Sequence, residues 1–208
     1  MAVLGYLLVA VVAYLLGSPP TGYLVARARG VDIRTVGSGN IGATNVIRVL
    51  GKPLGIFVLV VDAAKGILAC WLLPILAQAL LGASAPVRLD LAAAVAGVAA
   101  ILGHNFTCWL RFKGGKGIAT SAGVLLALIP AACGLAILVW TAAFVATRYV
   151  SVASLAAACS LPVVVWLTRG GTPLVVMAAV LGALAFYTHR ANLQRLIAGT
   201  EHRFRWKK

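Results

Sequence analysis

The chain has 208 residues, 62% of them hydrophobic, and its mean hydropathy of +1.02 excludes an ordinary soluble domain. It carries 18 lysines and arginines against four acids, which gives a formal net charge of +14. The apolar segments are continuous and do not alternate with polar residues, which excludes a transmembrane β-barrel. The four cysteines show no paired spacing, so neither a disulfide framework nor a metal site is expected. The composition predicts an all-α integral membrane protein whose single domain covers residues 1–208.

The positions of the basic residues indicate membrane topology and not nucleic-acid binding. Basic residues cluster at 27–52, at 111–116, at 148 and at 190–208, and only Arg88 and Arg169 lie in the connections between them. By the positive-inside rule, all four clusters belong on the cytoplasmic side. We therefore expect the lipid bilayer as a partner and no nucleic acid, with part of the charge available for anionic headgroups or substrates.

The first apolar segment, residues 3–25, is interrupted by Gly17-Ser18-Pro19-Pro20, where a kink is expected near its cytoplasmic end. It has neither a basic run before it nor a small-residue cleavage signature after it. We therefore expect the segment to be retained and not removed as a signal peptide. Because it leads into the first basic cluster, the N-terminus is expected outside.

Residues 36–51, VGSGNIGATNVIRVLG, form a polar, glycine-rich stretch. Its first glycines are Gly37, Gly39 and Gly42, and its polar side chains are those of Ser38, Asn40, Thr44 and Asn45. Such glycines allow successive N–H groups to face one concavity, which suits an anion. Residues 43–50 predict a short helix whose N-terminal dipole faces the same place, with Arg48 one turn in. The alternative is a loop whose glycines only make turns.

Residues 53–81 form the second predicted span, and residues 91–102 form the third. Asp62 and Lys65 lie within the second span, three residues apart and hence on one helical face. An acid and a base inside a membrane normally pair. The pair is either a structural contact that faces the other helices or part of a coupling or proton path.

A second polar stretch, GHNFTCWLRFKGGKGIAT, occupies residues 103–120. The glycines around Lys116 predict a flexible or left-handed turn that presents one ammonium group, with Lys113 close by. The stretch is not a Walker A loop, because Gly117 follows the lysine and the first glycine of that pattern is absent. His104 is either a packing and hydrogen-bonding residue or a catalyst.

Pro130 lies near the middle of the apolar residues 118–147 and decides the topology. One kinked span would put Arg148 and the basic tail outside, whereas a hairpin that turns near Pro130 returns both to the cytoplasm. The charge favours the hairpin, and its short first half suits a broken or re-entrant segment. The sequence thus predicts a compact bundle of about seven transmembrane helices, with the C-terminus in the cytoplasm.

Two further polar stretches border the last spans. Ser151 and Ser154 lie one helical turn apart at the start of the span that ends near residue 167, where serines often serve only as caps. After a final span at 173–188, a helix is expected to continue to about residue 198. In it His189 and Asn192 share a face, either as part of a site or as ordinary interfacial residues.

Together the four stretches resemble a known family. The motifs are GSGNIGATN at 37–45, GHxFxxxLxFKGGKGxAT at 103–120, YVSxAS at 149–154 and HRxNxxRLxxGTE at 189–201. In these motifs, in their order and in its length, the chain closely resembles the bacterial membrane glycerol-3-phosphate acyltransferases that use acyl phosphate as donor. Thr107 stands where members of this family frequently have proline, and Arg111 stands where they commonly have lysine. These two differences affect the local loop shape more than the chemistry.

The resemblance implies transfer of a fatty acyl group from acyl phosphate to the 1-hydroxyl of sn-glycerol 3-phosphate, the first step of phospholipid biosynthesis. The products are lysophosphatidic acid and phosphate, and the site faces the cytoplasm from the bacterial inner membrane. The resemblance implies no metal or other cofactor, and it leaves the oligomeric state open. Substrate and phosphate binding are assigned to Gly37, Ser38, Gly39, Asn40, Gly42, Thr44, Asn45, Arg48, His104, Lys113 and Gly115. Catalysis is assigned to Lys116, Ser154, His189 and Asn192.

Acyl phosphate is a mixed anhydride, so positioning two phosphates and stabilising the developing charge could carry most of the rate without a covalent nucleophile. The proton acceptor is either His189 or a substrate phosphate oxygen, since the scarcity of acids leaves little room for a Ser-His-Asp relay. Trp109 stands five residues after His104, where thioester-dependent acyltransferases carry an aspartate, which argues against acyl-CoA. The rival class is a transporter or channel for a phosphorylated solute, which the one-sided polar stretches disfavour. A lipid-phosphate-binding or structural subunit is a third, weaker alternative.

Overall fold

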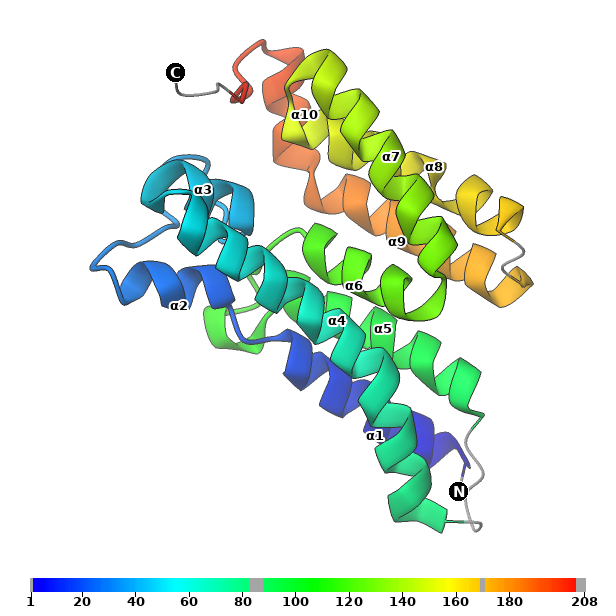
Figure 1. The fold of residues 1–208 in the computed structure, drawn as a ribbon. Helices are drawn as coiled ribbons and strands as arrows, with labels where there is room; N and C mark the ends of the chain where they lie inside the picture. The colour runs from blue at the N-terminus through cyan, green and yellow to red at the C-terminus, as the bar shows by residue number, and fades with distance from the viewer. Residues whose placement is uncertain (1, 83–87, 169–170, 205–208) are drawn as a thin grey trace. The chain divides into compact units, whose positions relative to one another are not determined.

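The computed structural model describes residues 2–82, 88–168 and 171–204. Within these ranges the regular elements are helices, as the sequence predicts (Figure 1). In chain order they are α1 (Ala2–Gly17), α2 (Thr21–Arg27), α3 (Ala43–Leu50), α4 (Lys52–Leu81), α5 (Leu89–Asn105), the 3-10 helix η2 (Cys108–Leu110), α6 (Ile118–Leu128), α7 (Pro130–Thr147), α8 (Val150–Leu167), α9 (Thr172–Thr188) and α10 (Arg190–Ile197). The connection that carries Arg169 and the basic end of the tail after Phe204 lie outside the described residues.

The chain divides into two compact units, residues 1–128 and residues 129–208. The first contains α1 to α6 and the second contains α7 to α10. The single membrane domain over residues 1–208 stays a prediction.

In the first unit, the expected interruption of the first apolar segment is confirmed, because α1 ends at Gly17 and α2 begins at Thr21. Pro19 and Pro20 lie in the gap, where their missing N–H groups cannot continue the helix. The Ser18 hydroxyl donates to the Tyr14 carbonyl at 2.8 Å and so satisfies one acceptor at the end of α1.

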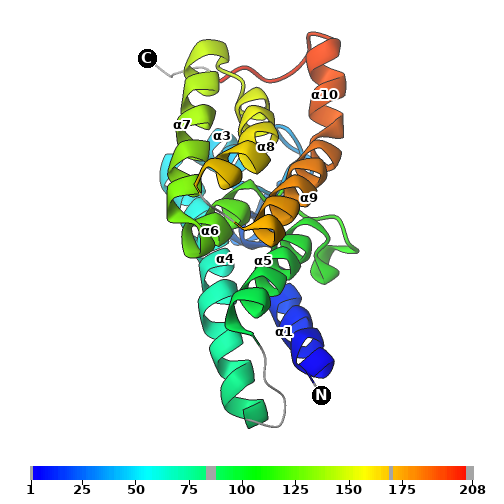
Figure 2. The ribbon, with the colours of Figure 1, turned by 90° about the vertical axis from the view of Figure 1, so that its right-hand side faces the viewer.

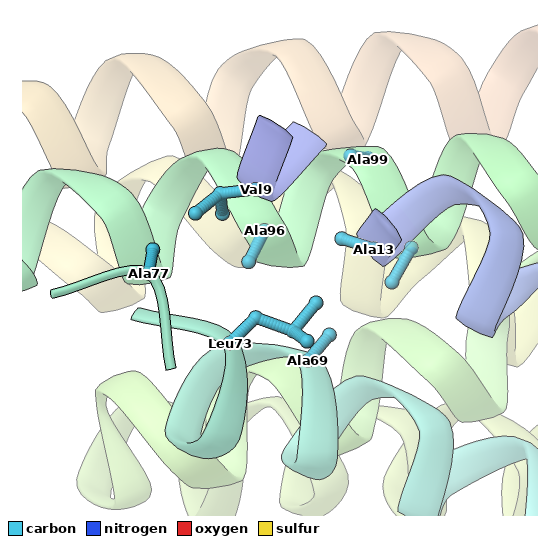
Figure 3. Packing of buried hydrophobic residues seen from close by; sticks show 8 residues of the cluster. Val9, Ala13, Ala69, Leu73, Ala77, Ala96 and Ala99 are labelled. Atoms are coloured by element: carbon cyan, nitrogen blue, oxygen red, sulfur yellow. The ribbon is translucent and has the colours of Figure 1, made fainter. Parts of the chain in front are cut away.

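One hydrophobic core cluster of the first unit is rich in alanine and is built by α1, α4 and α5 (Figure 3). Its buried residues are Val9, Ala13, Ala69, Leu73, Ala77, Ala96, Ala99 and Ala100. Small side chains let helix backbones approach closely, which is how helices in a membrane gain packing. A Cβ at Gly17 would overlap the Ala100 carbonyl, and one at Gly103 would overlap the Tyr14 carbonyl. Glycine therefore sets the distance between α1 and α5.

The long helix α4 packs against α3, α5 and α6 in the same unit. Its contact with α6 also depends on glycine, because a Cβ at Gly66 would overlap the Thr120 carbonyl and one at Gly123 would overlap the Ala63 carbonyl. This close approach fixes the middle of α4, where Asp62 and Lys65 lie.

In the second unit, α8 packs against both α7 and α9 (Figure 2). The rings of Trp140 and Phe144 stack on α7 with their centroids 5.0 Å apart. The helix expected after the last span is present as α10, but it does not continue α9 in a straight line, because the pair bends by 57° at His189. Gly199, with a φ of 67°, follows the end of α10 as expected for a helix stop.

The break expected at Pro130 is present, since α6 ends at Leu128 and α7 begins at Pro130. Ile129 lies between them with a φ of −146° and a ψ of 74°. Among the described residues, five helical segments are long and apolar enough to cross a membrane, and α9 with α10 makes a sixth if the bent pair is one span. The helix α6 is shorter, with 11 residues. The fold is thus that of a helical membrane protein, while the count of seven spans, the hairpin and the orientation stay predictions.

Candidate functional site

The polar stretches of the sequence fall two in each unit. The first unit holds the loop before α3 and the loop between α5 and α6, and the second holds the start of α8 and the junction of α9 with α10.

Asn45 on α3 organises the loop that precedes this helix. Its side-chain Nδ2 donates to the carbonyls of Asn40 at 2.9 Å, Val36 at 3.1 Å and Ile33 at 3.3 Å. Its Oδ1 accepts from the Ser38 N–H at 2.9 Å. The side chain is 1% exposed, so the amide that was expected to line a phosphate site is used to hold the loop together.

The same loop presents backbone N–H groups where α3 begins. Gly37 and Gly39 have φ values of 61° and 70°, as expected for left-handed turns that glycine accepts without strain. The Asn40 Oδ1 accepts from the Gly42 N–H at 2.7 Å. In the described part of the chain, the N–H groups of Ala43 and Thr44 in the first turn of α3 have no protein acceptor. This end of the helix therefore suits an anion.

Arg48 extends the positive charge of this loop. It lies one turn into α3, is exposed, and its Nη1 donates to the Asn45 Oδ1 at 3.1 Å. On the other side of the loop, Asp32 and Arg34 pair at 2.7 Å. The hydrogen bond from the Arg34 guanidinium lowers the pKa of Asp32 to about 2, so this acid stays charged. Its ion-pair partner is Arg34 and not Arg48.

The second loop runs from Thr107 to Gly117 and carries the other expected cations. The Thr107 hydroxyl donates to the Ser18 carbonyl and accepts from the Trp109 N–H at 3.3 Å, which starts η2. Arg111 and Phe112 then take positive φ values of 53° and 61°, a costly conformation for residues other than glycine. Lys113 is exposed and Lys116 is half-buried.

The glycines that flank Lys116 have different tasks. Only Gly117, with a φ of 75°, has the left-handed conformation expected for the turn. Gly114 and Gly115 are required by space, since their N–H groups donate to the Asn105 and His104 carbonyls at 3.0 Å and a Cβ on either would overlap His104. The end of α5 thus forms a close-fitting support for the lysine loop.

His104 is buried within that support. Its Nδ1 lies 3.8 Å from the Asp62 Oδ1, and its Nε2 lies where a Cβ of Gly115 would be. Asp62 and Lys65 make the expected ion pair, at 2.7 Å with side-chain exposures of 2% and 8%. The predicted binding residue His104 therefore connects this pair to the lysine loop.

In the second unit, Glu201 joins several of the expected residues. Its Oε1 accepts from the Asn192 Nδ2 at 2.6 Å and from the Ser151 hydroxyl at 2.9 Å. Its Oε2 accepts from the Arg195 Nε at 2.7 Å. Burial raises the pKa of Glu201, but the three hydrogen bonds and the Arg195 charge lower it further, so the net pKa lies below its ordinary value.

His189 and Ser154 have separate partners. The Nδ1 of His189 lies 2.8 Å from the Ala185 carbonyl, and because a carbonyl only accepts, this nitrogen carries a hydrogen. The Trp140 Nε1 donates to the Ser154 hydroxyl at 3.2 Å. Both His189 and Ser154 are buried.

Glu201 was not singled out as a site residue from the sequence. Two signals could have identified it, because it is one of only four acids in the chain and it closes the motif at 189–201. Spacing alone did not show its partners, since Ser151 lies 50 positions earlier.

The two units offer groups suited to an anionic substrate. The first unit provides a helix N-terminus with Arg48 and a rigidly supported loop with Lys116. The second provides the Asn192 amide, the Ser151 hydroxyl and Arg195 around the Glu201 carboxylate, with His189 and Ser154 held by partners of their own. Among the described residues, no group of three or more His, Cys, Asp or Glu side chains is placed to hold a metal ion.

Comparisons with known proteins agree with these motifs. The sequence model described as glycerol-3-phosphate acyltransferase matches residues 7–199. The chain is 48% identical to a glycerol-3-phosphate acyltransferase of Desulforudis audaxviator over the full length of both proteins. It is 50% identical to one from Geobacter metallireducens, with 93% of this chain and 94% of the relative covered.

Solved structures give the same result. The fold matches the crystal structure of PlsY (YgiH), an integral membrane glycerol 3-phosphate acyltransferase in its glycerol 3-phosphate form, with a TM-score of 0.83 and 40% identity over 96% of each chain. A lysophosphatidic acid form matches with a TM-score of 0.82 and 39% identity, over 96% of this chain and 95% of that one. The chain is an integral membrane protein that belongs to the glycerol-3-phosphate acyltransferase family.

Proposed function

We propose that this chain transfers a fatty acyl group from acyl phosphate to the 1-hydroxyl of sn-glycerol 3-phosphate, giving lysophosphatidic acid and inorganic phosphate. The reaction would be the first step of phospholipid biosynthesis. The observation that carries the proposal is the loop before α3, where Asn45 holds a run of glycines around a helix N-terminus next to Arg48. Relatives named as glycerol-3-phosphate acyltransferases support the acceptor and the reaction class.

The chemistry of the chain supports acyl phosphate as the donor. In the proposed step, the 1-hydroxyl oxygen attacks the acyl carbon, a carbon–oxygen ester bond forms, and the bond to the phosphate oxygen breaks. The hydroxyl proton passes to a base and the phosphate leaves with the electron pair. Because this leaving group is already good, the protein needs fixed positive groups more than a covalent nucleophile.

Each predicted residue has a proposed task in this step. The loop at 37–45 and Arg48 bind phosphate, and Lys116 with Lys113 neutralises charge on glycerol 3-phosphate or on the leaving phosphate. Gly115 and His104 shape the lysine loop. Ser154, His189 and Asn192 orient the acceptor, with Asn192 held by Glu201.

We also propose where the reaction occurs. The four basic clusters support a site on the cytoplasmic side of a bacterial inner membrane, because positively charged connections are retained on that side. Soluble glycerol 3-phosphate would reach the site from water, and the acyl chain would reach it from the bilayer.

A donor comparison tests the proposal. Purified protein in detergent or nanodiscs would receive glycerol 3-phosphate with palmitoyl phosphate, palmitoyl-CoA or palmitoyl acyl carrier protein, and phosphate and lysophosphatidate would be measured. We expect turnover with palmitoyl phosphate, and little with either thioester. Turnover with a thioester alone would overturn the donor, and no turnover with any donor together with uptake of glycerol 3-phosphate into liposomes would support a transporter instead. Arg48→Ala serves as the low-activity control.

A further inference from the structure

An ion pair lies within the first unit on α4, a helix apolar enough to cross a membrane. Asp62 and Lys65 are 2% and 6% exposed, and Asp62 lies about 15 Å along the helix from Lys52 at ~1.5 Å per residue. The Lys65 ammonium donates to the Asp62 Oδ1 at 2.7 Å, to the Thr21 hydroxyl at 2.6 Å and to the Pro19 carbonyl. Thr21 in turn donates to the Asp62 Oδ1 at 2.9 Å. All three ammonium hydrogens are therefore used.

Stability alone is a weak reason for such a pair. Burying two charges costs about as much as their attraction returns, and well-packed apolar residues of similar size often replace a buried pair without loss. Apart from Lys52 and Gln78 near its two ends, the rest of α4 is apolar, so a hydrophobic pair would suit the helix. The position of the charges points to a further task.

The carboxylate and the lysine loop lie on either side of one imidazole. The His104 Nδ1 lies 3.8 Å from the Asp62 Oδ1, and its Nε2 occupies the space that a Cβ of Gly115 would need. The His104 carbonyl also accepts from the Gly115 N–H at 3.0 Å. Lys116 is the next residue along the chain.

This chain of contacts is rigid at both ends. The pair itself is anchored to the break between α1 and α2 through Pro19 and Thr21. At the other end, Gly114 and Gly115 fit so closely against the end of α5 that no side chain could be added. A shift of the imidazole would therefore displace the backbone that presents Lys116.

We propose that Asp62 and Lys65 are positioning residues for acyl transfer, which hold the His104 imidazole and through it the loop that presents Lys116. The inference rests on the proposed function, in which Lys116 serves a substrate phosphate. His104 is then a support for Gly115 and does not itself contact the substrate.

The main test removes both charges together. Asp62→Asn alone would leave a buried ammonium without its counterion and risks unfolding, so the working variant is Asp62→Asn with Lys65→Met. Glycerol 3-phosphate and palmitoyl phosphate would each be varied on protein whose folded fraction is known from thermal melting. We expect the KM for glycerol 3-phosphate to rise about tenfold or more per folded molecule, with a smaller change in the KM for palmitoyl phosphate. Unchanged kinetics per folded molecule would overturn the proposal and leave a purely structural pair.

A second comparison asks whether the pair acts through the imidazole. His104→Ala should itself weaken the use of glycerol 3-phosphate, and adding the two α4 substitutions to it should lower kcat/KM by less than about twofold more. Losses that multiply in the triple variant would overturn the route through His104. Asp90→Asn is the matched control, because Asp90 lies on the same helix as His104 and the substitution breaks only its exposed pair with Arg88, which precedes the helix. It should change neither constant.

Hydrogen exchange separates this proposal from the proposed function. The double α4 variant should exchange amide hydrogens faster at 113–117 than the parent protein, whether or not any turnover is observed. No turnover by the parent protein would count against the acyl-transfer proposal alone. Unchanged exchange at 113–117 would count against the positioning role even in an active enzyme.

Discussion

The amide of Asn192 donates to the Glu201 carboxylate at 2.6 Å, which ties α10 to the segment that follows it. The same carboxylate accepts from Ser151 at the start of α8. An amide whose nitrogen is held by a half-buried carboxylate has a fixed orientation, so its oxygen faces a defined direction. Glu201 therefore sets the geometry of a residue that we propose to orient the acceptor.

Replacing Glu201 by Gln should damage both the fold and the reaction. The glutamine amide keeps one oxygen, but its NH2 group meets donors from Asn192 or Arg195, so at least one hydrogen bond is lost and Arg195 loses its counterion. We expect a stability loss of about 1–3 kcal/mol and a fall in kcat/KM of about ten- to a hundredfold. Thermal melting and steady-state kinetics measure the two effects. Gln194→Glu, at an exposed position of α10, is the control that should leave both unchanged.

The same acid predicts how stability depends on pH. The pKa of Glu201 in the folded protein lies below its ordinary value of 4.5, so the folded state favours the charged form. Its contribution is therefore present above about pH 4.5 and is lost as the pH falls through the lowered folded-state value. The difference in melting temperature between the parent protein and Glu201→Gln should shrink between pH 7 and pH 3.5. A difference that stays constant over this range would contradict the assignment.

Asn45 gives a prediction for the loop before α3. In Asn45→Asp, the Nδ2 that donates to the carbonyls of Ile33, Val36 and Asn40 becomes a second carboxylate oxygen, which repels them. We expect a loss of about 2–3 kcal/mol and faster proteolysis between residues 33 and 42, with little remaining activity. Melting curves and mass spectrometry of the fragments provide the measurements. Thr35→Ala, on the exposed part of the same loop, should behave like the parent protein; equal cleavage of both variants would contradict the role of Asn45.

Local chemistry explains which features the sequence could predict. The helical spans follow from continuous apolar segments, and the breaks at Pro19-Pro20 and Pro130 follow from the missing N–H of proline. The left-handed backbone at Gly37, Gly39 and Gly117 follows from the same kind of local rule. The pairing of Asp62 with Lys65 was predictable because one helical turn separates them.

Contacts between distant parts of the chain explain what the sequence missed. Nothing near Glu201 indicates Ser151, and nothing near His104 indicates that its ring faces Gly115. The use of Asn45 was also unexpected, because an amide in a glycine-rich loop can equally bind a ligand or the loop itself. The bend at His189 could not be predicted, because no proline or glycine lies beside it in the sequence.

Arg48 tests whether the first loop requires a planar cation. Arg48→Lys keeps the positive charge but removes the forked guanidinium group. In the parent protein one nitrogen of this group donates to Asn45, and the group has the planar shape that binds phosphate. We expect the KM for a phosphate-bearing substrate to rise about ten- to a hundredfold while kcat changes less. Arg34→Lys, whose partner is Asp32, is the matched control and should have parent kinetics. Kinetics of Arg48→Lys equal to those of the parent would remove this residue from the site.

Lys116 tests the second loop in the same way. In Lys116→Ala the flanking glycines keep their hydrogen bonds to α5, so the loop should retain its conformation while its ammonium is lost. We expect kcat/KM for glycerol 3-phosphate to fall by about a hundredfold or more, with a melting temperature close to that of the parent. A large fall in melting temperature would mean that Lys116 supports the fold instead. Lys52→Ala, at the exposed start of α4, is a control with the same change of charge.

His189 distinguishes the two possible proton acceptors. Its Nδ1 donates to the neutral Ala185 carbonyl at 2.8 Å and the ring is buried. At Nδ1 the imidazolium that a general base would become is therefore stabilised by a carbonyl and not by a carboxylate, while burial disfavours its charge. We therefore expect a substrate phosphate oxygen to take the hydroxyl proton, with His189 orienting the acceptor through Nε2.

His189→Gln should then lower kcat by only about tenfold, because glutamine can still donate and accept hydrogen bonds. The fall of kcat/KM at acidic pH should remain in this variant, since it would reflect protonation of phosphate, whose second pKa is about 6. Steady-state rates from pH 5 to pH 9 measure both quantities. A loss of about a thousandfold together with disappearance of the acidic limb would instead identify His189 as the general base. Gln194→Ala, on α10 and exposed, is the control for a side-chain change in this segment.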